Sequence, residues 1–381
     1  MGPPSLTFAW IRSPTSVIGE AVERRTIALE PRTLGLKLLQ GPLSPPVVGE
    51  IVARVTMAGV CGTDAHRLAG DVAPGAYAYA FGHEPVGVVH ALGEGRVVDS
   101  AGSPLAVGDR IVWYPASAGC GECAACLRGE HRVCLVETWP PSALEPNSAG
   151  YQDYATLSRR VEVYRLPDAV PDEAFVALGC ALPTALAGAD RLGPISPEHT
   201  VVVQGSGPVG LASAALAAMS GPRQLIVIGT PRDRLSWADR LGATTTIDLD
   251  ATTPRERRNR VMELTEGAGA DVVIEAAGVA EAFVEGLELL ARAGRYLVTG
   301  LFSGARQVSI NPVIINNRAL RIIGNLGATP AQRRRAVELA ASLHSRHRIG
   351  DLVTLREPLT RTADAIRRLG LGEVTKAVVI P

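Results

Sequence analysis

The sequence predicts an α/β protein of two domains, in which an irregular β domain precedes a doubly wound parallel sheet. Three observations predict this class. Short strand-like runs broken by Gly and Pro fill the first part of the chain, and buried strands alternate with helices in the second part. The 381 residues suffice for two domains, and a hydrophobic fraction of 46% excludes a disordered protein.

The first part of the chain carries the short strands. They are rich in β-branched and other apolar residues and are expected at 34–39, 50–57, 86–92, 110–113 and 150–157. Residues 1–25 form a Pro-rich extension, and residues 115–140 form a loop-rich lobe that holds four cysteines. We therefore expect an irregular β domain over residues 26–175.

The pattern changes near residue 172. Helices are expected at 172–192, 209–219, 232–241 and 281–291, and buried strands at 200–204, 224–228, 271–275 and 295–299. Strands that alternate with helices form a parallel sheet covered on both faces. This domain is predicted to span 176–326. A helix at 330–344 and short strands follow, and the segment 327–381 is expected to rejoin the first domain.

Charge and cysteine usage narrow the function classes. The 38 basic and 38 acidic residues balance, and the arginines are scattered, so neither nucleic acid nor an anionic membrane surface is favoured as a partner. No apolar run is long enough to cross a bilayer, and no signal-peptide pattern is present, which predicts a cytoplasmic protein. In that setting the close spacing of the cysteines indicates metal binding or catalysis.

A glycine-rich loop follows the first buried strand of the second part. Residues 201–204 lead into Gly205-Ser-Gly207-Pro208-Val209-Gly210, which opens a helix. In this G-x-G-x-x-G pattern, the first glycine permits a tight turn, the second admits a pyrophosphate, and the third lets the helix pack on the strand. A plain glycine-rich turn is the alternative, but the strand–loop–helix context favours a dinucleotide site.

The next strand bears on the choice between NAD and NADP. An NAD site usually has an acidic residue at this strand end, where the chain has Gly229 followed by Thr230. Arg232 and Arg234 come next and are candidates to meet a 2′-phosphate, or are ordinary surface residues of a helix start. The pattern leans toward NADP.

Four cysteines share one loop. Cys120, Cys123, Cys126 and Cys134 have the spacing C-x2-C-x2-C-x7-C, which matches a closed tetrahedral zinc site that holds a loop with few apolar residues. An iron–sulfur cluster is the sharper alternative, because four thiolates also serve iron. Disulfides do not suit the inferred compartment. Structural zinc is the favoured interpretation.

The two remaining cysteines suggest a second metal. Cys61 and Cys180 flank the sequence Gly82-His83-Glu84. Two thiolates and one imidazole leave a fourth position open, as catalytic zinc needs. Taken singly, a buried cysteine is usually a small core residue, and a histidine is usually structural.

These motifs together resemble the medium-chain dehydrogenase/reductase superfamily, in its zinc-dependent alcohol dehydrogenase branch. The resemblance covers roughly residue 30 to the C-terminus. It rests on 59–64, 82–84, the four-cysteine lobe, 179–180 and 205–210. It implies a GroES-like catalytic domain joined to a Rossmann cofactor domain, and hydride transfer between an alcohol and NAD(P).

The resemblance also implies roles for single residues. Cys61, His83 and Cys180 would hold the catalytic zinc, and Glu84 would lie beside it and exchange onto it. Asp64 would accept a hydrogen bond from His83. Thr63 would take the substrate hydroxyl proton and His66 would pass it to solvent. At position 62 some family members carry a basic residue against the pyrophosphate, whereas this chain has Gly62, which predicts looser cofactor binding.

Three alternatives compete with this prediction: a zinc-free enone or quinone reductase of the same superfamily, a non-catalytic dinucleotide-binding relative, and a zinc hydrolase. Each of these alternatives leaves at least one of the motifs described above unexplained. The substrate pocket is expected at 68–79, 115–117 and Trp139, and because these residues carry no fixed charge apart from Asp71, an apolar secondary alcohol is favoured. A homodimer or homotetramer is expected through a strand at 319–325.

Overall fold

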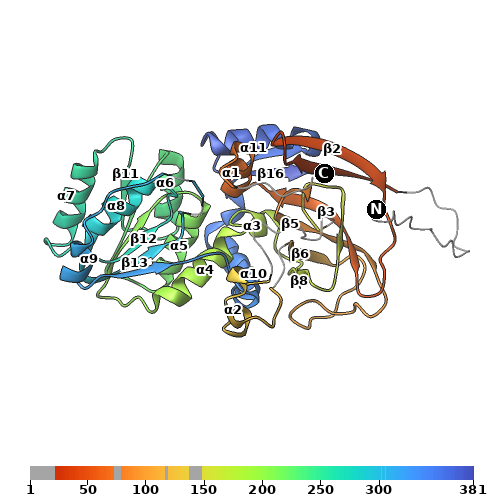
Figure 1. Cartoon of the computed structure of the whole chain (residues 1–381), viewed down its shortest axis with the longest axis horizontal. Coiled ribbons are helices and arrows are strands. Elements are labelled where there is room, and N and C mark those ends of the chain that lie inside the picture. Colours follow the sequence, from red (N-terminus) through yellow and green to blue (C-terminus); the bar gives the residue numbers. More distant parts are fainter. Residues whose placement is uncertain (1–21, 73–78, 116–118, 137–147, 302, 305) are drawn as a thin grey trace, which may run out of the picture.

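The chain folds into two bodies joined side by side in this computed structural model, which describes residues 22–72, 79–115, 119–136, 148–301, 303–304 and 306–381 (Figure 1). One body is built on a six-stranded sheet with the order β11-β10-β9-β12-β13-β14, and all its pairings are parallel. Its strands are β9 (Thr200–Gln204), β10 (Gln224–Gly229), β11 (Thr245–Asp248), β12 (Ala270–Glu275), β13 (Leu290–Val298) and β14 (Arg321–Gly324). Because the chain winds outward in both directions from β9, this is the predicted Rossmann arrangement.

Both faces of the parallel sheet are buried, because successive side chains on a strand point to opposite faces. On β9, Val201 and Val203 face one apolar core and Val202 faces the other. The first face packs against α4 (Ala181–Leu192), α5 (Pro208–Met219) and α6 (Arg232–Arg240). The second face packs against α7 (Pro254–Leu264), α8 (Ala280–Leu289) and α9 (Val313–Asn317).

The other body is the expected β domain, and its main sheet joins distant parts of the chain in the order β15-β16-β3-β5-β6-β8, with β7 paired to β3. The C-terminal strand pairs antiparallel with β3, so that Val378 lies opposite Gly59. The strands are β3 (Ile51–Gly59), β5 (Glu84–Leu92), β6 (Arg110–Tyr114), β7 (Tyr154–Leu157), β8 (Glu162–Arg165), β15 (Val353–Pro358) and β16 (Lys376–Ile380). A smaller sheet, ordered β2-β1-β4, holds β1 (Glu23–Glu30), β2 (Gly35–Pro42) and β4 (Tyr79–Ala80).

Helices connect these strands. They are α1 (Gly62–Ala69), α2 (Ala124–Leu127), α3 (Asp172–Val176), α10 (Pro330–His347) and α11 (Thr362–Gly370), with the 3-10 turns η1 (His131–Val133), η2 (Ile349–Leu352) and η3 (Leu359–Arg361). In the described ranges, no helix has both the length and the apolar character needed to cross a membrane.

Several sequence-based boundaries differ from the structure; for example, β13 begins at Leu290, where the helix expected over 281–291 should continue, and β11 is not among the expected strands. The helix expected over 172–192 is two helices, α3 and α4, which are separated at Gly179, where φ is +34°. The extension predicted over residues 1–25 overlaps β1, which begins at Glu23 and is not among the predicted strands. The alternation in β1 is weak, because Ile27, Ala28 and Leu29 are all buried.

Candidate metal centres and cofactor site

Four side chains that can bind a metal meet between the two bodies. Cys61 follows β3 and is the N-cap residue of α1. His83 and Glu84 stand at the start of β5, and Cys180 stands at the break between α3 and α4. Their ligand atoms all lie within 4.8 Å of one another. Residues separated by more than one hundred positions therefore form one cluster.

The spacing of this cluster fits zinc. The Sγ atoms of Cys61 and Cys180 lie 3.5 Å apart, and two sulfur ligands about 2.3 Å from one tetrahedral zinc are about 3.8 Å apart. Hydrogen bonding from Cys180 lowers the pKa of Cys61 well below its usual range, although burial opposes this shift. A thiolate is the form that binds metal.

Asp64 orients His83. Its carboxyl is fully buried, and its Oδ1 lies 3.2 Å from His83 Nδ1. The other oxygen accepts hydrogen bonds from the Cys61 backbone N–H at 2.9 Å and the Tyr151 hydroxyl at 2.8 Å. Burial alone would raise the pKa of Asp64, but the charge of His83 and these hydrogen bonds hold it below its ordinary value. With Nδ1 turned to Asp64, Nε2 of His83 is left for a metal.

Glu84 is held by a residue that the sequence analysis does not predict. Its Oε1 accepts a hydrogen bond from the Cys180 backbone N–H at 2.8 Å, and its Oε2 pairs with the Lys376 ammonium group. Both side chains are buried. Burial opposes ionisation of Glu84, but the charges of Lys376 and His83 lower its pKa below the ordinary value. The only sequence signal is scarcity, because Lys376 is one of two lysines in the chain.

Gly179 makes room for this carboxylate. A Cβ atom at position 179 would lie 2.3 Å from the carboxyl carbon of Glu84, and φ is +34°. Any larger residue would therefore displace Glu84 and strain the backbone. The glycine before Cys180 is thus explained by the packing of Glu84, a contact that spans 95 positions of sequence.

The two residues expected to move a proton lie on α1. Thr63 is half-buried, and its Oγ1 lies 3.7 Å from Cys61 Sγ. His66 lies at the surface, where its Nδ1 is 2.9 Å from Asp71 Oδ2. No hydrogen bond joins Thr63 to His66 within the described chain. One residue is thus near the metal cluster and the other near solvent.

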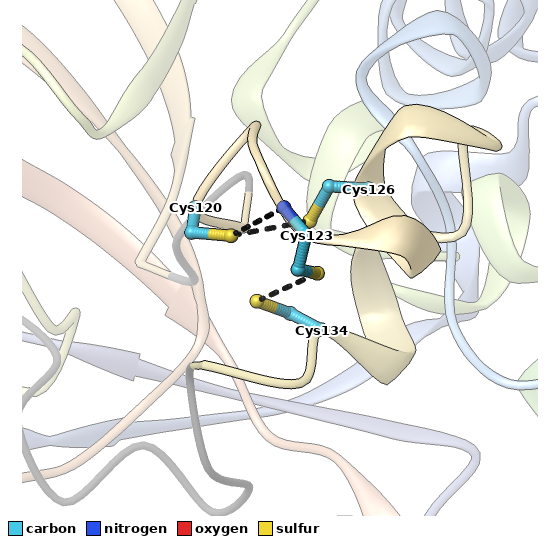
Figure 2. Close-up of side chains that lie close together, drawn as sticks. All are labelled: Cys120, Cys123, Cys126 and Cys134. Carbon is cyan, nitrogen blue, oxygen red and sulfur yellow. Dashed lines mark hydrogen bonds between the residues drawn. The ribbon is translucent and has the colours of Figure 1, made fainter.

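The four lobe cysteines also converge. Figure 2 shows their sulfur atoms turned toward one another, and the Sγ atoms lie 3.9 Å apart both for Cys120 and Cys126 and for Cys123 and Cys134. Hydrogen bonds from the backbone N–H groups of Cys126 and Leu135 lower the pKa of Cys123 to about 6. These distances match tetrahedral zinc as well as the first cluster does.

The glycine-rich loop is shaped for a phosphate. A Cβ atom on Gly210 would lie 1.9 Å from the Gly205 carbonyl oxygen, so the helix packs against the strand only through glycine. A Cβ atom on Gly207 would meet nothing within 4 Å, which leaves open space at the start of α5. Gly207 is the N-cap residue of that helix and Pro208 is its first residue, with Val209 following, so the free N–H groups of the helix point into this space.

The end of β10 explains why an acidic residue is missing there. A Cβ atom on Gly229 would lie 2.4 Å from Ser206 Oγ, and Ser206 in turn donates a hydrogen bond to the Thr230 carbonyl. Arg232 is exposed and lies 3.0 Å from Asp248 at the end of β11.

Arg234 contacts the other body: its guanidinium donates a 2.7 Å hydrogen bond to the Val374 carbonyl. It is therefore engaged at the domain junction. Its role at a 2′-phosphate stays a prediction. Of the expected pocket, residues 73–78, 116–117 and Trp139 lie outside the described part of the chain.

Comparison with known proteins assigns the family. Residues 48–168 match the alcohol dehydrogenase GroES-like domain, and residues 208–342 match the zinc-binding dehydrogenase domain. The 5-exo-hydroxycamphor dehydrogenase of Pseudomonas putida is 38% identical over 338 residues, which cover 89% of this chain and 93% of that protein. The chain belongs to the zinc-dependent alcohol dehydrogenases of the medium-chain dehydrogenase/reductase superfamily. It is a zinc-dependent, nicotinamide-linked alcohol oxidoreductase.

Solved structures agree with this assignment. An alcohol dehydrogenase of Thermotoga maritima superposes with a TM-score of 0.84 at 27% identity, covering 94% of this chain and 100% of that one. A zinc-binding dehydrogenase of Sinorhizobium meliloti, solved with NADP, has a TM-score of 0.80 at 26% identity with the same coverage.

Proposed function

We propose that this enzyme interconverts neutral, apolar secondary alcohols and their ketones with NADP, at a zinc held by Cys61, His83 and Cys180. The observation that carries the proposal is the metal-binding cluster itself. In it, two thiols, one imidazole and one carboxylate place their ligand atoms within 4.8 Å of one another. The Pseudomonas putida relative is named for a hydroxycamphor, an alicyclic alcohol, which supports this substrate class.

The chain supplies the proton path. Zinc, when bound, supplies a Lewis acid that favours loss of the alcohol proton. Thr63 lies beside Cys61 and accepts this proton, and the cofactor ribose would carry it to His66, which is exposed at the surface and delivers it to solvent. A nicotinamide bound at the glycine-rich loop would supply the acceptor for the hydride of the carbinol carbon, so that the alcohol would lose two electrons and one proton would be released.

The remaining residues set the geometry. Asp64 fixes the ring of His83, so that Nε2 faces the metal. Glu84 is anchored by Lys376 and the Cys180 N–H, close enough to exchange with the ligands of the metal. A second zinc, held by Cys120, Cys123, Cys126 and Cys134, stabilises the lobe. That gives two zinc ions per chain, and the six free thiols suit the reducing cytoplasm.

The adenosine half of the cofactor site supports NADP. Gly229 offers no carboxylate to a ribose 2′-hydroxyl, and Ser206 fills the place of such a side chain. Arg232 is exposed and can exchange Asp248 for a 2′-phosphate. The Thr230 hydroxyl donates a hydrogen bond to Asp250 and would have to exchange this carboxylate for the same phosphate. The Sinorhizobium meliloti neighbour was solved with NADP.

The experiment that tests the proposal is a turnover assay with both cofactors. Purified, zinc-loaded protein is given NAD or NADP with primary alcohols, open-chain and bicyclic secondary alcohols, and polyols, and reduced nicotinamide is followed by absorbance. Turnover should be fastest with an apolar secondary alcohol and NADP. Preference for a polyol or a primary alcohol would overturn the substrate class, and preference for NAD would overturn the cofactor choice.

Replacing Gly62 with arginine should tighten cofactor binding. Gly62 is exposed at the start of α1, and a Cβ atom there would meet nothing within 4 Å, so a long side chain fits. A new cation beside the pyrophosphate should lower the dissociation constant of NADPH about threefold to tenfold at low salt. Fluorescence titration measures this change. Gly62→Gln is the matched neutral control, and equal affinity for both variants would contradict the prediction.

The edge strand β14 should pair with a second copy of the chain. It ends the order of the parallel sheet, and Ile322 on it is 39% exposed. An unpaired edge with apolar side chains favours a two-fold contact that continues the sheet. Sedimentation velocity should therefore give a dimer or a tetramer. A monomer at micromolar concentration would exclude this assembly.

A further inference from the structure

Glu275 is a buried carboxylate that has no cationic partner among the described residues. It ends β12 and has no exposed surface. Its Oε1 accepts hydrogen bonds from the N–H groups of Ala277 and Gly278 at 2.9 and 2.7 Å. Its Oε2 accepts those of Gly300 and Leu301 at 3.0 and 3.1 Å. Because each oxygen already faces two donors, the group has no place for a proton and is an anion.

These four hydrogen bonds tie together two loops. One loop follows β12 and the other follows β13, and both leave the carboxyl edge of the sheet. The packing between them is tight, since a Cβ atom on Gly300 would lie 2.6 Å from the Gly278 nitrogen. The glycine-rich loop joins the same cluster, because a Cβ atom on Gly205 would lie 2.7 Å from the Ala276 carbonyl oxygen. Glu275 therefore sets the geometry of the loops beside the phosphate-binding turn.

The position of these loops identifies their ligand. In a sheet of this order the pyrophosphate lies at the turn after β9, and the adenosine lies over β10. The nicotinamide half of the cofactor then lies on the opposite side of β9 from the adenosine half, over the ends of β12 and β13. The oxidised nicotinamide ring carries a positive charge and the reduced ring carries none.

We propose that Glu275 is a positioning residue of the nicotinamide site, and that its buried charge favours the oxidised cofactor over the reduced one. The inference rests on the dinucleotide site proposed above. Peptide N–H dipoles spread the charge of Glu275 but do not cancel it, and no ion pair to this residue occurs in the described part of the chain. A buried charge with little screening acts over several ångströms.

The test measures the dissociation constants of NADP and NADPH for the zinc-loaded enzyme without alcohol, by fluorescence and calorimetry. Glu275→Gln removes the charge. The ratio of the oxidised to the reduced constant should then rise at least about fivefold. Glu275→Asp keeps the charge on a shorter side chain, and Gly300→Ala disturbs the same loops without changing charge. Both should weaken the two cofactor forms alike, and their ratio should stay within about twofold of the wild-type ratio.

The outcomes separate the possible explanations. An unchanged ratio in Glu275→Gln would reduce Glu275 to a purely structural anchor and overturn the proposal. A ratio that rises about fivefold in Glu275→Asp or Gly300→Ala would also overturn it, whether or not Glu275→Gln folds. If the wild-type protein binds neither cofactor form, the proposed function itself fails.

Discussion

Replacing Cys61 with serine is expected to lower kcat/KM by about three orders of magnitude or more, because a Lewis acid supplies several kcal/mol to this kind of reaction. Serine is a poor zinc ligand, and Cys61 lies 3.5 Å from the other thiol of the cluster. The fold should survive. Cys61 is the N-cap residue of α1, a position that serine favours, and Asp64 would still accept the hydrogen bond from the backbone N–H of residue 61.

Metal analysis and activity together check this result. The variant should keep about one zinc per chain, in the lobe, and a melting temperature close to that of the wild type. Cys134→Ser is the matched control, because it removes a thiol from the other cluster. It should lose the lobe zinc and stability while the first cluster keeps its metal. Retained turnover in Cys61→Ser, or loss of both zinc ions, would exclude the assigned roles.

The parallel sheet was predictable because its signal is local. Each buried strand is a short run of apolar residues between turn signals, and the strands 200–204 and 224–228 are found within one residue of their expected ends. The break between α3 and α4 was not predictable, since 172–192 is largely apolar. Gly179 interrupts it only because Glu84, 95 positions earlier, occupies the space beside it.

In the candidate site, too, residues in short motifs were predictable and residues with partners in distant segments were not. The residues expected for the two metal clusters lie in short motifs, and the structure brings Cys61, His83, Glu84 and Cys180 together. Lys376, Glu275 and Arg234 have their partners in other segments of the chain. No spacing rule places a lysine 292 positions after its carboxylate. The contacts of Lys376 and Arg234 depend on how the C-terminal strand returns to β3, and those of Glu275 depend on how the loops after β12 and β13 meet.

Replacing Lys376 with methionine is expected to destabilise the catalytic domain by about 3–5 kcal/mol, since it leaves a buried carboxylate without its cation. Lys376 and Glu84 are both almost fully buried, and the remaining donor to Glu84 is the Cys180 N–H at 2.8 Å. The charge of Lys376 also lowers the pKa of Glu84, after the opposing effect of burial. Without it, Glu84 takes up a proton or turns to the metal, and turnover falls with stability.

A double-mutant cycle separates the ion pair from simple loss of packing. Denaturant unfolding is measured for Lys376→Met, Glu84→Gln and the double variant. If the pair carries the effect, the double variant should recover most of the stability lost in Lys376→Met, because no buried charge is left unpaired. Additive losses would mean that Lys376 acts through packing alone. Zinc affinity gives a second measurement of the same ion pair. An ionised Glu84 without its lysine competes with the other ligands for the metal, so Lys376→Met should change zinc affinity more than the double variant does. Lys376→Arg keeps the positive charge and should change zinc affinity least.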